Sequence, residues 1–320
     1  MRLAMVALLA CGCVKSTVAD PGTAVTTAHT APAGALVVMS CPEALAGDDG
    51  GYSPLYLVDA AGAVTRWVPD PLPEGAENLS SASTPALYFD AMLKLWSLTP
   101  DGKVHLLDES PSRDESRFSS DGAHRLVVSE KNLEWRTLDG GVEHRFELSE
   151  FPSHVYPSPN GERAVAKLKD TTALIDAHGP ATLLDHQLLI GASWSPGGKE
   201  VALVTQPLAG GATPVDDRAL LWRAKLDGSA PVPLALPARP GPGLIDRVLG
   251  VPQTATAVRG LVWTDEGLAI LSNHESECWW GGRDNPSGCY WALYRLPPEG
   301  GTPKRLSPRA FRCQALFQLR

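Results

Sequence analysis

A short unit that recurs about every 39 residues constrains the fold of this chain more than any other sequence feature. In each copy, an aromatic residue and a Ser or Thr precede a Gly-containing turn, and an apolar segment follows the turn. Copies begin at Phe118, Tyr156, Trp194 and Trp263. Self-similarity at a period of roughly 20 to 50 residues is the signature of repeat architectures, so we infer that one structural unit recurs along the chain.

A second repeated feature, a series of glycines, alternates along the sequence with these aromatic turns. Each lies between two apolar segments, where the positive φ that glycine allows suits the tight turn of a β-hairpin. The six glycines are Gly62, Gly102, Gly140, Gly179, Gly228 and Gly300. Each period therefore contains four strands, A to D, with one turn between A and B and a glycine hairpin between C and D. A four-stranded antiparallel unit of this length is typical of a propeller blade.

The sequence thus predicts an all-β fold, a six-bladed β-propeller, over residues 35–320. The 30 glycines and 28 prolines among 320 residues agree with many short strands joined by turns. The blade at about residues 79–108 lacks the aromatic signature, which leaves seven blades open as the alternative count. We expect the aromatic residues of the repeat to pack between adjacent blades.

The turn Trp194-Ser195-Pro196-Gly197-Gly198-Lys199, with the apolar strand after it, resembles the TolB-type (PD40, WD40-like) propeller repeat. Residues 158–161 and 99–103 echo the same turn. The resemblance covers roughly residues 35–320, although only the third to sixth blades carry the aromatic turn. It implies a role in protein complexes of the bacterial cell envelope, but a fold does not by itself determine a function.

The two ends of the repeat region are incomplete in complementary ways. Residues 35–40 look like a strand B with no strand A before it, and residues 311–319 follow the last strand D with no strand B after them. We therefore expect the C-terminal segment to be strand A of the first blade, because closing the ring in this way removes unpaired sheet edges.

The first 13 residues are typical of an export signal, with Arg2 before an apolar stretch at 3–10. The following Ala-Cys-Gly-Cys resembles the lipobox of bacterial lipoproteins, so either Cys11 or Cys13 would carry the lipid. This predicts a protein anchored in the cell envelope through its lipid alone; a cleaved signal that leaves a soluble secreted or periplasmic protein is the alternative. Residues 14–34 are rich in Thr, Ala, Pro and Gly without periodicity, and predict a flexible tether.

Four cysteines remain after the signal, and export would place them in an oxidising compartment. If strands A and B of the first blade are antiparallel, Cys313 lies opposite Cys41. Cys278 and Cys289 flank one loop. We therefore predict the disulfides Cys41–Cys313 and Cys278–Cys289, with free buried thiols as the alternative.

The long insertions all fall in B–C or D–A connections, which share one face of a propeller. They are residues 41–53, 206–218, 237–258 and 272–290. Because connections on a rigid scaffold tolerate change and carry function, this face is the candidate binding surface. Large aromatics and Arg are typical of binding hot spots, and the insertion at 272–290 contains several of them. The alternative is that its tryptophans pack back onto the blade. The candidate binding residues are Trp279, Trp280, Arg283, Asp284, Asp216 and Asp217.

The formal net charge of −8, without a Lys/Arg cluster, argues against a nucleic-acid partner. No nucleophile-elbow or nucleotide-binding motif is present, so no catalytic residue and no cofactor or metal is predicted; acidic pairs at 48–49 and 216–217 are the weak candidates for Ca²⁺. We expect a monomeric, non-catalytic binding scaffold for an envelope protein or peptide. The alternatives are a six-bladed hydrolase of the lactonase kind with Ca²⁺ in its channel, and a carbohydrate-binding propeller that uses Trp279 and Trp280.

Overall fold

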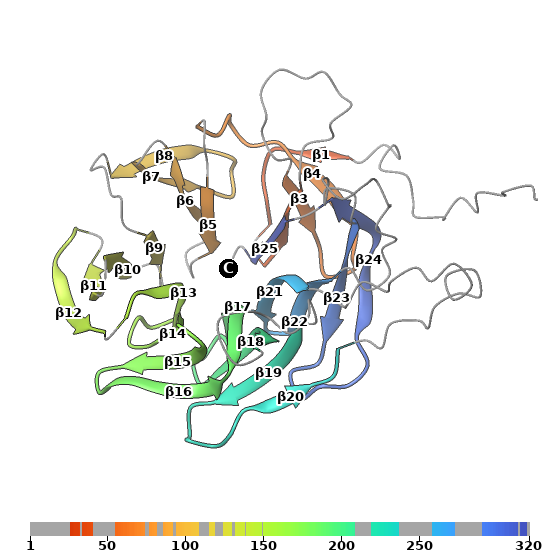
Figure 1. Ribbon diagram of the computed structural model, residues 1–320. Coiled ribbons are helices and arrows are strands. Elements are labelled where there is room, and N and C mark those ends of the chain that lie inside the picture. The colour runs from red at the N-terminus through yellow and green to blue at the C-terminus, as the bar shows by residue number, and fades with distance from the viewer. Residues whose placement is uncertain are drawn as a thin grey trace, which may run out of the picture.

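In the computed structural model, six antiparallel β-sheets stand side by side in a ring (Figure 1). The structure describes residues 26–32, 34–40, 55–73, 77–81, 86–91, 94–108, 115–118, 124–129, 132–137, 139–148, 150–208, 219–236, 258–272, 290–312 and 314–318. All regular secondary structure in these ranges is β-strand, and they contain no helix long and apolar enough to cross a membrane. The predicted six-bladed β-propeller is confirmed.

Each blade has the predicted order of strands, counted from the ring axis outwards. Blade 2 contains β5 (Glu77–Ser81), β6 (Leu87–Ala91), β7 (Lys94–Leu98) and β8 (Val104–Asp108). Blade 3 contains β9 (Glu115–Phe118), β10 (His124–Ser129), β11 (Asn132–Thr137) and β12 (Val142–Glu147). Blade 4 contains β13 (Pro152–Pro157), β14 (Ala164–Leu168), β15 (Thr171–Asp176) and β16 (Gly179–Asp185).

Blade 5 contains β17 (Gln187–Trp194), β18 (Glu200–Pro207), β19 (Leu220–Lys225) and β20 (Val232–Leu234). Blade 6 contains β21 (Val258–Thr264), β22 (Gly267–Ser272), β23 (Tyr290–Leu296) and β24 (Lys304–Arg312). Blade 1 contains β25 (Gln314–Gln318), β2 (Leu36–Ser40), β3 (Leu55–Val58) and β4 (Val64–Trp67), and β1 (Thr27–Ala28) adds a fifth strand outside β4.

The C-terminal strand closes the ring as predicted. β25 is the innermost strand of blade 1 and pairs antiparallel with β2, so that Leu36 lies opposite Gln318 and Ser40 lies opposite Gln314. Cys41 directly follows Ser40 and Cys313 directly precedes Gln314, but both cysteines lie outside the described residues. The strand pairing is confirmed, and the disulfide stays a prediction.

The repeat aromatics pack between blades, as expected. Trp194 ends β17 and is buried in an apolar cluster that joins blades 4 and 5. Its indole Nε1 donates a hydrogen bond to the carbonyl oxygen of Tyr156, the corresponding aromatic of blade 4, at 3.0 Å. Trp263 is buried in the same way between blades 5 and 6. In blades 4 to 6 the aromatic position of the repeat therefore packs where neighbouring blades meet.

The structure differs from the predicted tether at its C-terminal end. β1 pairs in parallel with β4, with Thr27 aligned with Arg66 and Ala28 aligned with Trp67. Ala31 and Ala35 are buried in the apolar cluster between blades 1 and 2. From Thr26 onwards the chain is therefore part of the propeller, because backbone hydrogen bonds and two small buried side chains hold it there.

The hairpin turns between strands C and D lie against the preceding blade at some seams. Gly62, in the β3–β4 turn, has φ +86° and lies so close to β24 of blade 6 that a Cβ atom would stand 1.7 Å from the carbonyl oxygen of Leu306. Gly228, in the β19–β20 turn, has a similar φ of +84°, but a Cβ there would meet no atom within 4 Å. The two turns share a backbone conformation and differ in their surroundings.

A buried carboxylate lies on the face of blade 3 that points towards blade 2. Leu133 and Trp135 of β11 pack into the cluster shared with blade 4, so Glu134 between them points the other way. Its side chain is 5% exposed and pairs with Arg136 of the same strand and Arg145 of β12. The Nε atom of Arg136 donates to Oε2 of Glu134 at 2.8 Å. Hydrogen bonds from both arginines outweigh burial and lower the pKa of Glu134 below its usual value of 4.5.

We predict that Gly62→Ala destabilises the protein far more than Gly228→Ala. Both substitutions place a side chain in the left-handed region, which costs about 1–2 kcal/mol. Only Gly62→Ala also forces a Cβ into the backbone of β24, so its loss in the free energy of unfolding should exceed about 3 kcal/mol. Urea unfolding of the two variants measures the difference, and equal losses would contradict the close packing of this turn on blade 6.

We predict that Glu134→Gln lowers the free energy of unfolding by about 1.5–3 kcal/mol at neutral pH, because two charged hydrogen bonds lose their acceptor charge. Since the folded-state pKa is depressed, this stabilisation is present above the unfolded value of 4.5 and is lost as the pH falls through the lower folded value. The gap between wild type and variant should therefore narrow in acid. Glu143→Gln is the control, because the Glu143 side chain is 39% exposed and its contact with His124 should contribute less. A gap that stays constant with pH would rule out the paired carboxylate as its source.

Candidate functional site

The structure places the bases of the four long insertions on one face of the ring. In a blade of antiparallel strands, the B–C and D–A connections leave from one face, and the A–B and C–D turns lie on the other. The insertions join β2 to β3, β18 to β19, β20 to β21 and β22 to β23. Their blades are consecutive in the ring, because β17 contacts β21 and β21 contacts β25. The grouping of the attachment points over blades 5, 6 and 1 is therefore as predicted.

The predicted binding residues themselves lie outside the described residues. These are Trp279, Trp280, Arg283, Asp284, Asp216 and Asp217. The same is true of the predicted disulfide and lipid-bearing cysteines, Cys11, Cys13, Cys41, Cys278, Cys289 and Cys313. The structure describes the strands from which the insertions leave.

The insertion in blade 5 leaves from a buried base. Leu208 and Ala219 stand at its two ends, and both are buried. The amide of Leu208 donates to the carbonyl oxygen of His186, in the connection between blades 4 and 5, at 2.9 Å. This hydrogen bond continues the pairing of β17 with β18 by one residue, up to the point where the insertion leaves.

A partly buried hydrogen-bond chain lies directly behind this base. The indole Nε1 of Trp222 donates to Oγ1 of Thr205 at 2.9 Å, and this hydroxyl donates to Oε1 of Gln187, also at 2.9 Å. Across the seam, Oγ1 of Thr172 in blade 4 donates to the carbonyl oxygen of Gln187 at 3.1 Å. Networks of this kind, when satisfied, hold a buried region in one arrangement. Sequence reasoning missed these residues, because Thr and Gln within apolar strands form no recognisable motif.

The rim of blade 4 next to this base carries an unusual backbone feature. Three non-glycine residues in the described chain have positive φ: His154, Lys169 and His186, at 51°, 44° and 51°. His154 lies at a bulge of the innermost strand β13, and the other two lie in the β14–β15 and β16–β17 connections. Such residues are uncommon and concentrate at functional positions. Two of the three, Lys169 and His186, lie in short connections between strands, whose tight turns account for their backbone conformation.

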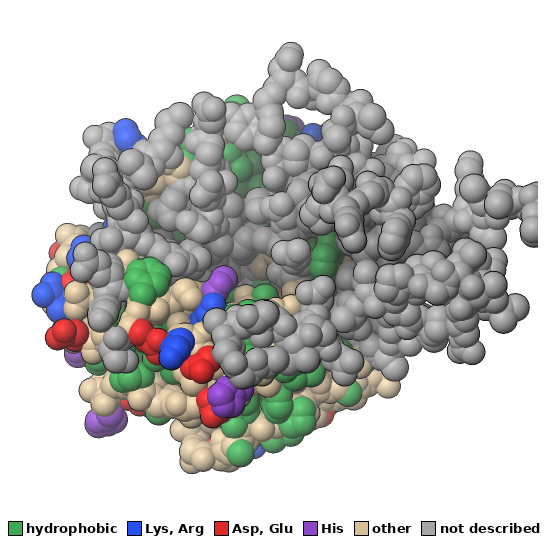
Figure 2. Space-filling view, viewed as in Figure 1, with side chains coloured by type: hydrophobic (Ala, Val, Ile, Leu, Met, Phe, Trp, Pro, Cys, Tyr) green, Lys and Arg blue, Asp and Glu red, His purple; other side chains and the backbone are tan. Residues whose placement is uncertain are grey.

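Charges on the visible face of blades 3 and 4 are mixed. Lys and Arg, Asp and Glu, and His side chains alternate there without forming an area of one sign (Figure 2). Within the part of the chain that the structure describes, no three His, Cys, Asp or Glu side chains come together as a metal site would require.

Three carboxyl groups with lowered pKa lie on the opposite face, in the C–D turns. The pKa values of Asp101, Asp139 and Asp227 fall below the usual value because side-chain hydroxyls hydrogen-bond to the carboxylates. In the first of these turns, Oγ1 of Thr99 donates to Asp101 at 2.6 Å. These shifts are explained by the geometry of Asp-Gly turns, since each aspartate directly precedes a turn glycine.

Comparison with known proteins supports the fold. No protein-family model matches the sequence, and no curated protein does either. Solved structures are similar in fold: a protein from Agrobacterium tumefaciens named as a TolB has a TM-score of 0.51 at 14% identity, covering 86% of this chain and 88% of its own. A Bacteroides caccae protein of unknown function has a TM-score of 0.52 at 14% identity, covering 90% of this chain and 100% of its own. The chain thus shares its propeller fold with these two proteins.

Proposed function

We propose that this protein is a non-catalytic binding scaffold of the bacterial cell envelope that holds a protein or peptide partner on its insert-bearing face. The observation that carries the proposal is the position of the four insertions. Their bases lie on one face, over three consecutive blades, and the base in blade 5 is fixed by buried side chains and by the chain of hydrogen bonds behind it. Rigid strands that present variable connections are the usual construction of a binding surface.

The cellular setting is part of the proposal. The N-terminal sequence supports export and a lipid on Cys11 or Cys13, and the repeat turn at 194–199 supports a TolB-type propeller. The fold shared with the Agrobacterium protein agrees with that assignment. The two alternative functions, a channel-Ca²⁺ hydrolase and a carbohydrate-binding propeller, gain no specific support from the described residues.

We predict that the double variant Trp279→Ala/Trp280→Ala loses its partner. The mature protein, immobilised through its N-terminus, would be used to recover interacting proteins from envelope extract, with quantification by mass spectrometry. If the two tryptophans are hot-spot residues, recovery of the specific partner should fall at least about tenfold. Val142→Ala, at an exposed position on the outer strand of blade 3, is the control and should change nothing. Equal recovery by wild type and double variant would remove this insertion from the interface.

We predict two disulfides, Cys41–Cys313 and Cys278–Cys289. The pairing of Ser40 with Gln314 supports the first, because the two cysteines are the next residues along these antiparallel strands. By the entropy of loop closure, the first bridge should stabilise the protein by about 5 kcal/mol and the second by about 3 kcal/mol. Peptide mapping of the exported protein without reduction checks the connectivity. Alkylation of Cys41 and Cys313 without prior reduction would show that they are free thiols.

A further inference from the structure

The segment before the first blade binds the edge of the propeller as an extended peptide. β1 runs parallel to β4, and the hydrogen bonds between them come from the backbone. The amide of Arg66 donates to the carbonyl oxygen of Thr26, and the amide of Val68 donates to that of Ala28, both at 2.9 Å. Addition of an extended strand to an exposed sheet edge is a common mode of peptide recognition.

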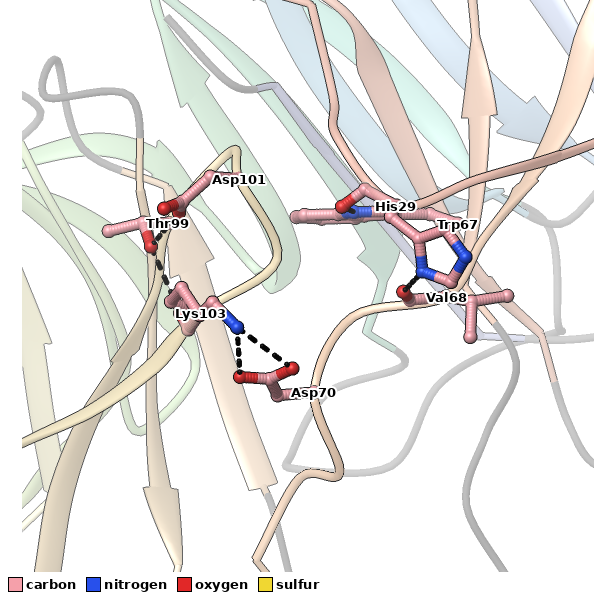
Figure 3. Close-up of polar contacts among 7 residues, drawn as sticks. All are labelled: His29, Trp67, Val68, Asp70, Thr99, Asp101 and Lys103. Atoms are coloured by element: carbon pink, nitrogen blue, oxygen red, sulfur yellow. Dashed lines mark hydrogen bonds and ion pairs between the residues drawn. The ribbon is translucent and has the colours of Figure 1, made fainter.

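The next residue, His29, makes two further contacts, with the last residue of β4 and with the residue that follows it (Figure 3). Its carbonyl oxygen accepts a hydrogen bond from Nε1 of Trp67 at 3.2 Å, and its Nδ1 lies 3.1 Å from the carbonyl oxygen of Val68. Trp67 is 2% exposed, so this carbonyl gives its indole N–H a partner that water could not readily supply. On the side of the segment, the contact with Trp67 involves a backbone atom only.

The segment then crosses from blade 1 to blade 2. The amide of Ala31 donates to the carbonyl oxygen of Pro100, in the β7–β8 turn of blade 2, at 2.6 Å. The Ala31 side chain is 8% exposed and packs in the apolar cluster that blades 1 and 2 share. A methyl group fits this position, and a long or charged side chain would have to displace the cluster.

The two blades also contact each other beside the segment. The amide of Asp70, which follows β4, donates to the carbonyl oxygen of Gly102 at 2.7 Å, and Nζ of Lys103 lies 3.1 Å from the Asp70 carboxylate. This ion pair is half-exposed and contributes little on its own. The segment therefore adds its own hydrogen bond and its buried Ala31 side chain to the direct contacts between the two blades.

Comparison with other seams shows what the segment replaces. Between blades 6 and 1, the turn glycine Gly62 lies directly against the backbone of Leu306. Between blades 1 and 2, a Cβ on the corresponding Gly102 would meet the carbonyl oxygen of His29 at 2.6 Å, ahead of Pro69. Backbone of the N-terminal segment thus occupies the place that an outer strand takes at the other seam.

We propose that the seam between blades 1 and 2 is a peptide-binding site, which the chain fills with its own N-terminal segment, described at residues 26–32 and 34–35. Its ligand class is an extended peptide that offers backbone carbonyls to the edge of β4 and a small side chain at the position of Ala31. A site built from edge hydrogen bonds and a pocket for one small side chain accepts the same sequence on a separate molecule. The site becomes available to such a peptide when the chain's own segment leaves it.

The test uses the full chain with Ala31→Glu, which places a charge in the apolar cluster and should release the segment. Thr30→Glu is the matched control, because Thr30 is exposed and the same charge there should leave the segment bound. Hydrogen exchange followed by mass spectrometry would report on the amides of Arg66 and Val68. Their exchange should be at least about tenfold faster in Ala31→Glu than in wild type, and unchanged in Thr30→Glu.

The second measurement is binding of a fluorescent peptide of residues 26–35. It should bind the Ala31→Glu chain, and bind neither wild type nor Thr30→Glu, whose sites are filled. The peptide with Glu in place of Ala31 should not bind. If Ala31→Glu fails to fold, Ala31→Asn is used instead, because it brings a polar side chain into the cluster without a charge and leaves β4 and Trp67 unchanged. A folded variant with fast-exchanging Arg66 and Val68 amides that binds no peptide would overturn the proposal, as would fast exchange of these amides in wild type.

Discussion

The pairing of β25 with β2 is the constraint on which the rest of the ring depends. Each blade of a propeller buries its faces only against its two neighbours, so a ring left open would expose two apolar faces. β25 prevents this by supplying Leu316, which is buried between blades 6 and 1. The fit is close, because a Cβ on Gly260 of β21 would lie 2.6 Å from Cβ of Leu316. The last strand of the chain thus completes blade 1 and covers blade 6 at the same time.

Both ends of the described chain terminate in blade 1. β25 is its innermost strand and β1 covers the outer edge of β4. Exposed strand edges carry unpaired N–H and C=O groups that can template aggregation, and proteins commonly cover or interrupt them. Here the C-terminal strand takes one edge and the N-terminal segment takes part of the other. Blade 1 is thus assembled from β1, from β2 to β4, and from β25, and the first and last of these cover the two edges of the β2–β4 sheet.

The fold was predictable from sequence because its signal is repeated. Each C–D turn needs a glycine with positive φ, and the repeat of this requirement at six positions, together with the aromatic turns, revealed the period. β1 has no such signal. Its two residues, Thr27 and Ala28, are held by backbone hydrogen bonds, which leave no pattern of side chains to recognise. Glu134 was missed for a related reason, since a buried carboxylate is recognisable only when the arginine of the next strand is seen beside it.

At the two seams of blade 1, close packing of the C–D turns explains why these turns carry no long insertion. The C–D turn of blade 1 lies against the outer strand of blade 6, and that of blade 2 lies against the N-terminal segment. An insertion in such a turn would push two blades apart, at a cost spread over the whole seam. The long insertions leave from B–C and D–A connections, on the face opposite to these turns. At these two seams the packing of short turns therefore limits where the sequence can lengthen, and the long insertions of this protein lie on the opposite face, where a binding surface can develop.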